Sequence, residues 1–244
     1  MTALAEAIEH RVARELILVV ECDPELGQAI VEQLAADGYR AELAGTAEHA
    51  RILASRSAPA LAVLGGLDSP RGALDLLEEM REPDHPDRPW VPDVPVIMVR
   101  GSATEPDVLR GFDAGADDFL AHPAGYLELR ARLRAILRRT RSDPGSERVL
   151  RVGPLLIEPD SRSVRLHGEL LDLRPLEFQL LRRLASEPRR VFCREELLRA
   201  VWGYRANGST RAVDSHACRL RRRFEVCGGR RWVINVWGVG YRLT

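Results

Sequence analysis

The sequence predicts a five-stranded, doubly wound α/β domain followed by a smaller α+β domain. Its 244 residues exceed the ~150 residues that are usual for one domain, so two domains are the first expectation. The first half alternates short apolar runs with segments of helical period, whereas the second half changes to short strands, three helical segments and a terminal hairpin. Apolar residues make up 45% and charged residues 30%, which is ordinary globular usage and argues against a disordered or fibrous chain.

Five apolar runs in the first half each precede an amphipathic segment. The predicted strands are residues 15–20, 40–43, 60–64, 94–99 and 117–120, and the predicted helices are residues 24–38, 46–55, 72–80, 105–115 and 126–139. Strands that alternate with helices predict a parallel sheet covered on both faces. Ligands of such sheets bind at the carboxyl ends of the strands. The residues there are Glu21, Cys22, Asp23, Gly65, Gly66, Arg100, Gly101, His122 and Pro123.

Four segments of the first half carry a resemblance to a known family. ILVVECDPEL, PALAVLGGLDS, VPVIMVRG and GFDAGADDFLAHP resemble the landmarks of a response-regulator receiver domain, and the likeness covers about residues 15–140. GADDFLAHP followed by LELRARLRAILRR is similar to the form found in regulators of the OmpR/PhoB type. The resemblance implies a flavodoxin-like receiver fold.

The departures from the family pattern fall on the chemistry of phosphorylation. A receiver needs an Asp nucleophile, acidic ligands for Mg²⁺, and a hydroxyl and a lysine that hold the phosphoryl oxygens. In this sequence Gly65 occupies the position of the nucleophile, and Glu21 and Cys22 occupy the positions of the acidic pair. Arg100 replaces the hydroxyl residue and His122 replaces the lysine. We therefore expect a receiver that acts without phosphorylation and that needs neither metal nor cofactor. Asp23 and Asp68 lie nearby in sequence, but we do not expect either to replace the nucleophile.

Three residues of this group admit two interpretations. Arg100 either pairs with Glu21 or Asp23 or extends into solvent along its apolar stem. We expect His122 to be a polar filler rather than a ligand. Cys22 is a candidate redox sensor, but neighbouring carboxylates disfavour its thiolate, so we expect an inert thiol.

The resemblance also implies a homodimer formed through the fourth helix, fifth strand and fifth helix. The salt-bridging residues of that interface match Asp118 with Arg132, and Asp117 with Arg139. Glu128 is present as well, but Val108 replaces the basic residue that usually meets it. The alternative is that the arginines after residue 129 form only a solvated helix face, because exposed ion pairs contribute ~0 to 1 kcal/mol each.

The second half predicts a helix that is basic on one side. Over about residues 209–225, Val213, Ala217, Leu220 and Phe224 share an apolar face. The remaining positions display Arg211, Ser215, His216, Cys218, Arg219, Arg221 and Arg222. Such a helix suits the DNA major groove, because phosphates attract cations and base edges need positioned donors.

This half resembles the winged helix-turn-helix domain of the same OmpR/PhoB type. The motifs are LRPLEFQLLRRLA, REELLRAVWGY, STRAVDSHACRLRRRFE and VWGVGYRL. The resemblance implies that Arg211, His216 and Arg221 contact phosphates and that Ser215 and Arg219 face bases. The resemblance also implies that the terminal hairpin, the wing, enters the adjacent minor groove. Trp237 stands where some relatives carry a wing arginine; we expect it to pack within the hairpin, with Arg242 as a backbone contact. The resemblance places RNA polymerase contacts in the loop at 203–208.

The zero net charge conceals a division between the halves. Residues 1–141 contain 16 arginines against 24 carboxylates, and residues 142–244 contain 20 against 12. A basic C-terminal half favours a polyanionic partner. Because the sequence contains no lysine, part of the arginine excess reflects GC-rich coding. The cysteines, which are Cys22, Cys193, Cys218 and Cys227, lack the CxxC spacing of a zinc site, and we expect reduced thiols.

Together these features predict a sequence-specific DNA-binding transcription regulator, a homodimer on a direct-repeat operator, with a phosphorylation-independent receiver. The alternative is a receiver whose altered pocket binds a small-molecule effector that controls DNA binding. No nucleophile–base pair suggests an enzyme. No apolar run approaches a membrane span and the N-terminus carries charges throughout, so we expect a cytoplasmic protein. The expected parts are an extension (1–14), a receiver (15–140), a linker (141–148) and a winged helix (149–244).

Overall fold

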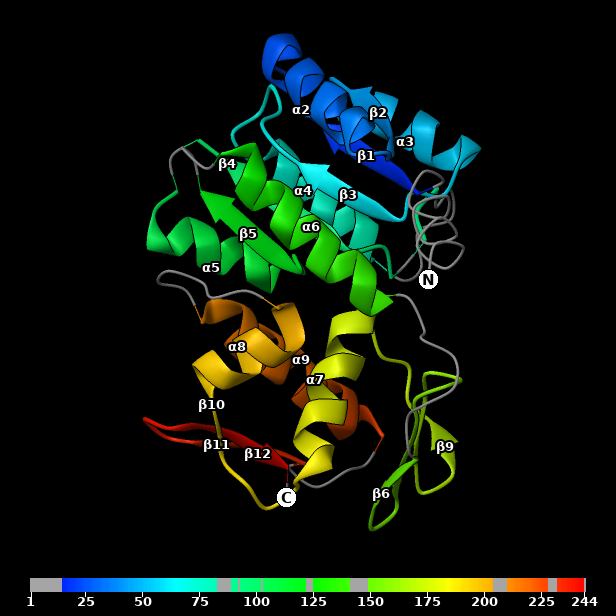
Figure 1. Cartoon of the computed structure of the whole chain (residues 1–244), viewed down its shortest axis with the longest axis vertical. Helices are drawn as coiled ribbons and strands as arrows, with labels where there is room; N and C mark the ends of the chain where they lie inside the picture. Colours follow the sequence, from blue (N-terminus) through cyan, green and yellow to red (C-terminus); the bar gives the residue numbers. More distant parts are fainter. Residues whose placement is uncertain are drawn as a thin grey trace, which may run out of the picture. The chain divides into compact units, whose positions relative to one another are not determined.

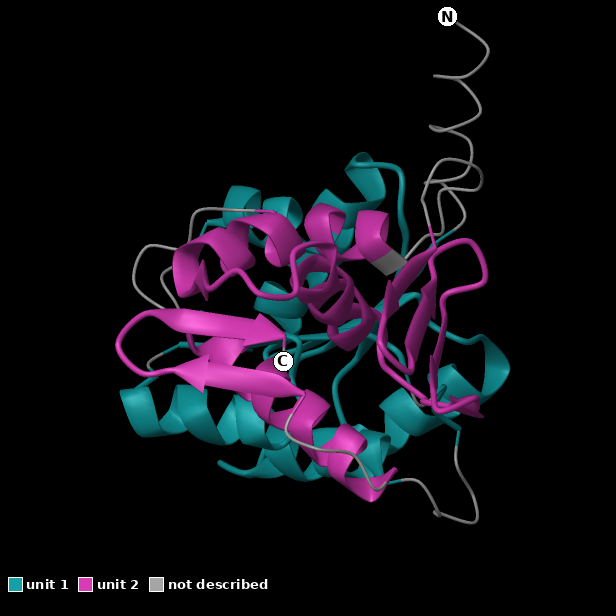
Figure 2. Ribbon diagram, turned by 90° about the horizontal axis from the view of Figure 1, so that it is seen from below, with its two compact units in different colours: residues 1–133 teal, residues 134–244 magenta. Residues whose placement is uncertain are grey.

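The computed structural model describes residues 15–82, 89–91, 93–101, 103–121, 125–140, 149–203, 210–227 and 232–243. The chain forms two compact units, Met1–Leu133 and Arg134–Thr244, which Figure 2 distinguishes by colour. The boundary between these units lies inside the helix α6 (Tyr126–Thr140). The expected extension at 1–14 and the expected linker at 141–148 lie outside the described residues.

The first unit is built on a parallel sheet of five strands in the order β2-β1-β3-β4-β5. The strands are β1 (Leu16–Val20), β2 (Arg40–Ala44), β3 (Leu61–Leu64), β4 (Val96–Arg100) and β5 (Asp118–Ala121). The helices are α2 (Pro24–Ala36), α3 (Ala47–Arg56), α4 (Gly72–Arg81), α5 (Glu105–Asp113) and α6 (Tyr126–Thr140), and they lie on both faces of the sheet (Figure 1). This is the predicted doubly wound fold.

The burial of each strand follows its place in this order. Central β1 and β3 are buried at every residue, whereas edge strand β2 is only partly buried. Continuous apolar runs such as 16–20 are expected where helices cover both faces of a parallel sheet. The order brings the carboxyl ends of β1 and β3 together, so residues 21–23 meet residues 65–66.

The second unit contains a four-stranded antiparallel sheet, three helices and a three-stranded sheet. The first sheet is β6 (Leu150–Val152), β7 (Leu155–Glu158), β8 (Ser163–Leu166) and β9 (Glu169–Leu170). The helices are α7 (Pro175–Ser186), α8 (Arg194–Trp202) and α9 (Arg211–Val226). The second sheet has the order β10-β12-β11, with β10 (Phe192–Cys193), β11 (Val233–Val236) and β12 (Gly240–Leu243). This arrangement is the predicted winged helix.

The terminal hairpin is joined to the helices by a close approach of two strands. β10, which the sequence pattern does not predict, pairs with β12 through Phe192 and Tyr241. A Cβ atom at Gly240 would collide with the carbonyl oxygen of Phe192 and lie 2.8 Å from its carbonyl carbon. Glycine at 240 therefore permits this strand pairing. None of the described helices is long and apolar enough to span a membrane.

Candidate functional site

The carboxylate of Glu21 lies between the carboxyl ends of β1 and β3, in a group that we call the strand-end pocket and define by the described residues Glu21, Cys22, Asp23, Gly65 and Arg100. Glu21 follows β1 and is only 7% exposed. Its Oε2 accepts a hydrogen bond from the backbone N of Gly66 at 2.8 Å, and its Oε1 accepts one from the backbone N of Asp23 at 3.0 Å. Two backbone donors thus fix the carboxylate between the ends of β1 and β3.

The Glu21 carboxylate fills the space beside Gly65 where another residue would begin its side chain. A Cβ atom at position 65 would collide with Oε2 of Glu21 and would lie 3.1 Å from Cδ of Glu21 and 3.2 Å from the carbonyl oxygen of Val20. These approaches are closer than van der Waals contact permits. Residue 65 is therefore glycine where Glu21 holds this position.

Asp23 has a structural role at the start of α2. Its Oδ1 accepts hydrogen bonds from the backbone N of Glu25 at 3.0 Å and of Leu26 at 3.1 Å. With Pro24 in the first turn, this is an N-cap in which a side-chain oxygen satisfies two of the helix's unpaired N–H groups.

The Cys22 thiol is exposed and lies beside carboxylates. Desolvation raises its pKa above the ordinary value, and the negative charges of Glu21 and Asp68 raise it further. A raised pKa leaves less thiolate at neutral pH, which agrees with the expectation of an inert thiol. Asp68 itself is exposed.

Arg100 pairs with neither Glu21 nor Asp23, so the first of its two interpretations does not hold. Its NH2 group donates to the carbonyl oxygen of Pro70 at 3.0 Å, and within the described part of the chain it makes no ion pair. The guanidinium is directed to the loop before α4 rather than to the Glu21 carboxylate. His122 and Pro123 lie outside the described residues.

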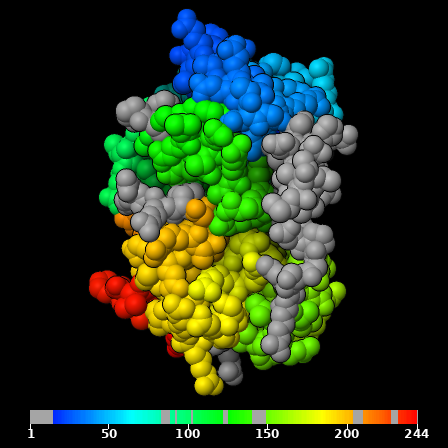
Figure 3. Space-filling model, in the orientation of Figure 1, coloured from blue at the N-terminus to red at the C-terminus, as the bar shows by residue number. Residues whose placement is uncertain are grey.

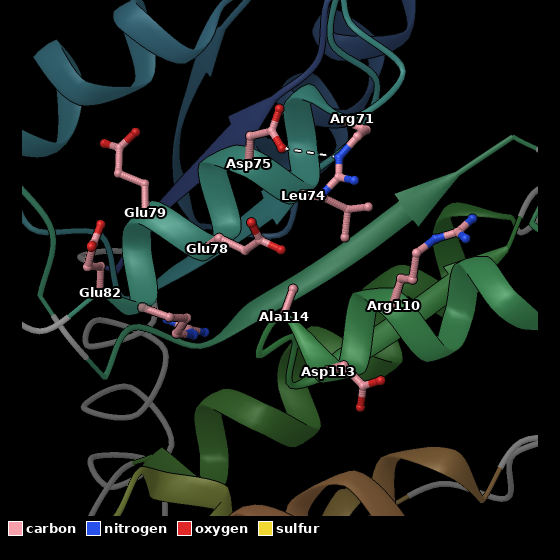
Figure 4. Close-up of a pocket in the computed structure, with 10 residues that line it drawn as sticks. Arg71, Leu74, Asp75, Glu78, Glu79, Glu82, Arg110, Asp113 and Ala114 are labelled. Atoms are coloured by element: carbon pink, nitrogen blue, oxygen red, sulfur yellow. Dashed lines mark ion pairs between the residues drawn. The ribbon is translucent and has the colours of Figure 1, made fainter.

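An open groove of the first unit lies apart from the strand-end pocket. Its lining comes from α4, α5 and the residues next to them, mostly as charged side chains that include Asp75, Glu78, Arg110 and Asp113 (Figure 4). None of its lining residues belongs to the strand-end pocket. Among the described residues, no group of three or more His, Cys, Asp or Glu side chains is arranged to hold a metal ion.

Asp117 forms a buried ion pair with Arg81. NH2 of Arg81 lies 3.0 Å from Oδ2 of Asp117, and both side chains are at most 6% exposed. Oδ2 also accepts from the backbone N of Val96, while Nε of Arg81 donates to the carbonyl oxygen of Gly115. Within one chain Asp117 is therefore held by Arg81, whereas the sequence analysis assigned it to Arg139.

Arg132 bridges Asp118 and Glu128 within the same chain. Its NH1 group lies 2.9 and 3.0 Å from the two carboxylate oxygens of Asp118, and its Nε lies 3.0 Å from Oε1 of Glu128. Asp118 is 2% exposed. In the second compact unit, Arg139 donates to the carbonyl oxygens of Ala135 at 2.9 Å and Ala200 at 3.2 Å.

Fewer of the predicted DNA-contacting residues of α9 are exposed than the sequence predicts. Arg211, Cys218 and Arg222 are exposed, and Ser215 is partly exposed between them. These positions recur every three or four residues and so share one side of the helix. The apolar face is buried as predicted, at Val213, Ala217, Leu220 and Phe224.

His216 lies in the core of the unit, so its expected phosphate contact is wrong for this conformation. It is 0% exposed, its Nδ1 lies 2.8 Å from the carbonyl oxygen of Ala212, and its ring meets Trp202 edge-on at 4.9 Å between centroids. An apolar contact with a tryptophan takes the place of a contact with solvent or phosphate.

Arg219 is held against α7, and this corrects its expected place on the open surface. Its Nε lies 3.3 Å from Oε1 of Glu177, its NH1 lies 3.2 Å from Oγ of Ser215, and its side chain is 14% exposed. Glu177 is 1% exposed, and its Oε2 accepts from the backbone N of Arg174, which caps α7. Arg219 thus neutralises a buried carboxylate.

Arg221 is turned toward the terminal hairpin instead of toward solvent. Its Nε donates to the carbonyl oxygen of Val233 at 2.8 Å, and its guanidinium lies over the ring of Tyr241 at 5.5 Å. Its expected phosphate contact is therefore not presented by this conformation.

A network that the sequence analysis missed joins α9 to the hairpin. The hydroxyl of Tyr241 donates to Oδ1 of Asp214 at 2.6 Å, and Nε of Arg194 donates to the same oxygen at 2.7 Å. The Arg194 guanidinium also lies over the Tyr241 ring at 5.1 Å. Burial raises the pKa of Tyr241 to about 12, and the hydrogen bond to Asp214 adds to the shift. No local sequence signal joins three residues that are so far apart in the chain.

Trp237 lies at the tip of the hairpin and is 93% exposed. The expectation that it packs within the hairpin is wrong, because the turn directs the indole outward. Arg242, on β12, is partly exposed. Polymerase contacts are expected in the loop at 203–208, and residues 204–208 of this loop lie outside the described residues.

A doubly wound five-stranded domain followed in one chain by a winged helix defines the class of response regulators with a DNA-binding output domain. The family model "Transcriptional regulatory protein, C terminal" matches residues 168–243. The DNA-binding response regulator MtrA of Mycolicibacterium smegmatis is 34% identical over 230 residues, which are 94% of this chain and 96% of MtrA. The transcriptional regulatory protein BaeR of Escherichia coli is 33% identical over 227 residues, 93% of this chain and 91% of BaeR.

The chain belongs to the OmpR/PhoB family of DNA-binding response regulators. A solved structure of a RitR mutant has a TM-score of 0.65 and 24% identity, and the match covers 94% of this chain and 99% of that one. This likeness concerns the fold alone.

Proposed function

We propose that this chain is a sequence-specific transcription regulator whose receiver acts independently of phosphorylation and supports a homodimer on DNA. The observation that carries the proposal is the position of the Glu21 carboxylate beside Gly65. A phosphoryl acceptor needs a side-chain carboxylate at the end of β3. Here the residue has no side chain, and the neighbouring space is filled.

The other groups of the strand-end pocket support the same proposal. Mg²⁺ prefers hard oxygen ligands, and a Cys22 thiol of raised pKa is a poor substitute. The Asp23 carboxylate caps the N-terminus of α2, and the Arg100 guanidinium donates a hydrogen bond to the carbonyl oxygen of Pro70. None of these contacts prepares a site for phosphoryl transfer.

The exposed face of α9 supports contact with DNA. Arg211 and Arg222 provide cations near its two ends, with Ser215 and Cys218 between them. Cations suit phosphates, and short polar side chains allow a helix to approach base edges closely. In this conformation Arg211, Ser215, Cys218 and Arg222 form the DNA-contacting set that we propose.

Exposed apolar residues on α5 and α6 support self-association. Leu109 is 37% exposed and Leu127 is 72% exposed. Arg132, on the same helix as Leu127, is held in a fixed orientation by Asp118 and Glu128. Exposed apolar side chains and oriented charges are typical of interfaces between protein chains.

Treatment with acetyl phosphate and Mg²⁺ tests the proposal. The intact mass and the affinity for a duplex selected from a random pool should both stay unchanged, and beryllium fluoride should have no effect either. A phospho-adduct mapped to Asp23 or Asp68 would contradict the independence from phosphorylation. Failure to select any duplex would contradict the DNA-binding function separately.

A further inference from the structure

The open groove between α4 and α5, which we call the α4–α5 groove, contains carboxylates that its own arginines do not neutralise. Its volume is about 730 Å³, and eight of its ten described lining residues are charged. Each described lining arginine already has a carboxylate partner: Arg71 pairs with Asp75, Arg81 with Asp117, and Arg110 with Asp107. The carboxylates of Glu78, Glu82 and Asp113 line the groove without an ion pair or side-chain hydrogen bond to any described residue.

The groove lies on the face of the sheet that α3, α4 and α5 cover. These three helices lead to the next strand in one direction along the sheet order, whereas α2 leads in the other direction and so covers the opposite face. Figure 3 shows that opposite face, where α2 (blue) and α6 (green) lie. The groove is therefore walled by two neighbouring helices, and Leu74 and Ala114 are the apolar members of its lining.

The three unpaired carboxylates gather where α4 and α5 end. Glu78 lies in the last turn of α4, Glu82 is the C-cap of α4, and Asp113 is the last residue of α5. Figure 4 shows the Glu78 side chain on the side of α4 that faces α5. Helix C-termini carry partial negative charge and are stabilised by cations, so carboxylates at these positions are unfavourable in the free protein. Local rules are commonly broken in this way at functional sites.

The shape and charge of the groove favour an extended cationic peptide as its occupant. Small molecules usually bind in enclosed, mostly apolar pockets, whereas this groove is open and its lining is mostly charged. Its unpaired carboxylates repel polyanions. Among the described residues no group of His, Cys, Asp or Glu side chains is arranged to hold a metal ion. An arginine guanidinium, by contrast, donates two parallel hydrogen bonds to one carboxylate.

We propose that the α4–α5 groove docks a basic, arginine-bearing segment of a partner protein. Guanidinium groups of the segment pair with Glu78, Glu82 and Asp113, and the apolar stems of its arginines lie against Leu74 and Ala114. The docked cations also offset the negative ends of the two helices. This surface is separate from the strand-end pocket and from α9, so the proposal does not depend on the proposed function. Such a partner gives the first unit an input that needs no phosphoryl group.

Binding of a labelled peptide to the full-length protein tests the proposal. The probe is a fluorescein-labelled hexapeptide in which arginine and glycine alternate. Its control carries citrulline, which has the shape of arginine without the charge, in place of each arginine. Fluorescence anisotropy at low salt should show saturable binding of the arginine peptide and at least about tenfold weaker binding of the citrulline peptide. High salt should weaken the arginine peptide's binding, because exposed ion pairs are screened.

Neutral variants then locate the binding site. Glu78→Gln, Glu82→Gln and Asp113→Asn should each weaken binding of the arginine peptide about two- to fivefold, the effect of losing one exposed ion pair. The triple variant should weaken binding at least about tenfold. Glu25→Gln is the matched control, since it makes the same charge change at an exposed position of α2, on the opposite face of the sheet. Its affinity should stay within about twofold of the wild type.

Thermal unfolding gives a second measurement that needs no peptide. The triple variant should melt at least about 1 °C above the wild type, because it removes negative charge from two helix C-termini. Glu25→Gln should melt below the wild type, since Glu25 lies in the first turn of α2, where a carboxylate is favourable. Opposite shifts from the same chemical change would indicate that the groove carboxylates serve a ligand rather than stability.

The docking assignment fails on any of five outcomes. Equal affinity of the arginine and citrulline peptides would exclude a cationic occupant, and equal affinity of the wild type and the triple variant would place the peptide elsewhere. Displacement of the peptide by an equal concentration of spermidine would identify a free polyamine as the occupant. Self-association of the wild type that the triple variant loses would assign the groove to a second copy of the chain. A triple variant that melts below the wild type would give the three carboxylates a structural role.

Discussion

The Glu21 carboxylate occupies the space in which any side chain at position 65 would begin. The backbone N atoms of Gly66 and Asp23 hold the carboxylate there, at 2.8 and 3.0 Å. A side chain at residue 65 could be accommodated only if Glu21 gave up at least one of these bonds.

A double-mutant cycle tests this relationship. Gly65→Ala should destabilise the protein by about 1–3 kcal/mol, as overpacking does. In a Glu21→Ala background the same change should cost at least about 0.5 kcal/mol less, because the obstructing oxygen is gone. Urea denaturation measures both costs. Gly101→Ala is the control, since nothing lies within 4 Å of its added Cβ; equal costs in the two backgrounds would refute the steric relationship.

Arg219→Ala should act mainly by lowering the free energy of unfolding and only secondarily on DNA specificity. It would leave Glu177, which is 1% exposed, without its cation, and breaking a buried pair costs about 3 kcal/mol. Arg222→Ala, at an exposed position of the same helix, should change stability by less than about 0.5 kcal/mol. Chemical denaturation compares the two variants, and Glu177→Gln should recover part of the loss. Equal stabilities of the two arginine variants would return Arg219 to the open DNA surface.

Maleimide modification of Cys218 should abolish DNA binding. The thiol is exposed at the middle of the proposed DNA-contacting face of α9, so an adduct would separate the helix from the groove. Cys218→Ser should bind DNA normally, and maleimide treatment should not change its DNA affinity. This variant controls for adducts at the exposed Cys22. Fluorescence anisotropy before and after modification gives the result. A modified wild type that keeps its affinity would show that DNA lies on another face.

Tyr241 should make the second unit less stable at alkaline pH. Its pKa is raised from 10.0 to about 12, so the folded protein keeps a phenolic proton that the unfolded chain releases. The contribution is complete below pH ~10, the usual tyrosine value, and is lost as the pH rises through the folded value. Tyr241→Phe should flatten this part of the stability profile, which denaturation at a series of pH values measures. A Phe variant with the wild-type slope would mean that another group titrates there.

Leu109→Glu should weaken self-association through the α5–β5–α6 surface. In a dimer that buries this position, each introduced carboxylate would lose its hydration without gaining a partner, which disfavours association. Ile52→Glu on α3 is the matched control, because Ile52 is 40% exposed and Leu109 is 37% exposed. Sedimentation velocity at tens of micromolar should show dimers for the wild type and the control and monomers for Leu109→Glu. A wild type that is monomeric without DNA would limit dimerisation to the operator.

The fold was largely predictable because period and burial agree along the chain. Residues 16–20 form a continuous apolar run and are buried on both faces of the sheet, and the apolar positions of α9 point into the core. The short strand β10 escaped prediction, since two residues carry no period of their own and their pairing depends on Gly240.

The sequence allowed us to predict which positions form the site but not which contacts their side chains make. Sequence matching located Glu21 and Gly65, yet only the geometry shows that one fills the space beside the other. Arg219, Arg221 and His216 were expected on the DNA face because helical spacing permits it. Their partners Glu177, Val233 and Trp202 lie on other elements, and a pattern within one helix contains no information about them.

The N-cap that Asp23 provides limits how this region can change over evolution. Asp23 starts α2, and its replacement by a residue that cannot cap would cost about 1 kcal/mol, whereas Asn, Ser or Thr would be tolerated. A search that counts acidic residues near this strand end would therefore count Asp23 among candidates for phosphoryl chemistry, although its carboxylate serves to start a helix.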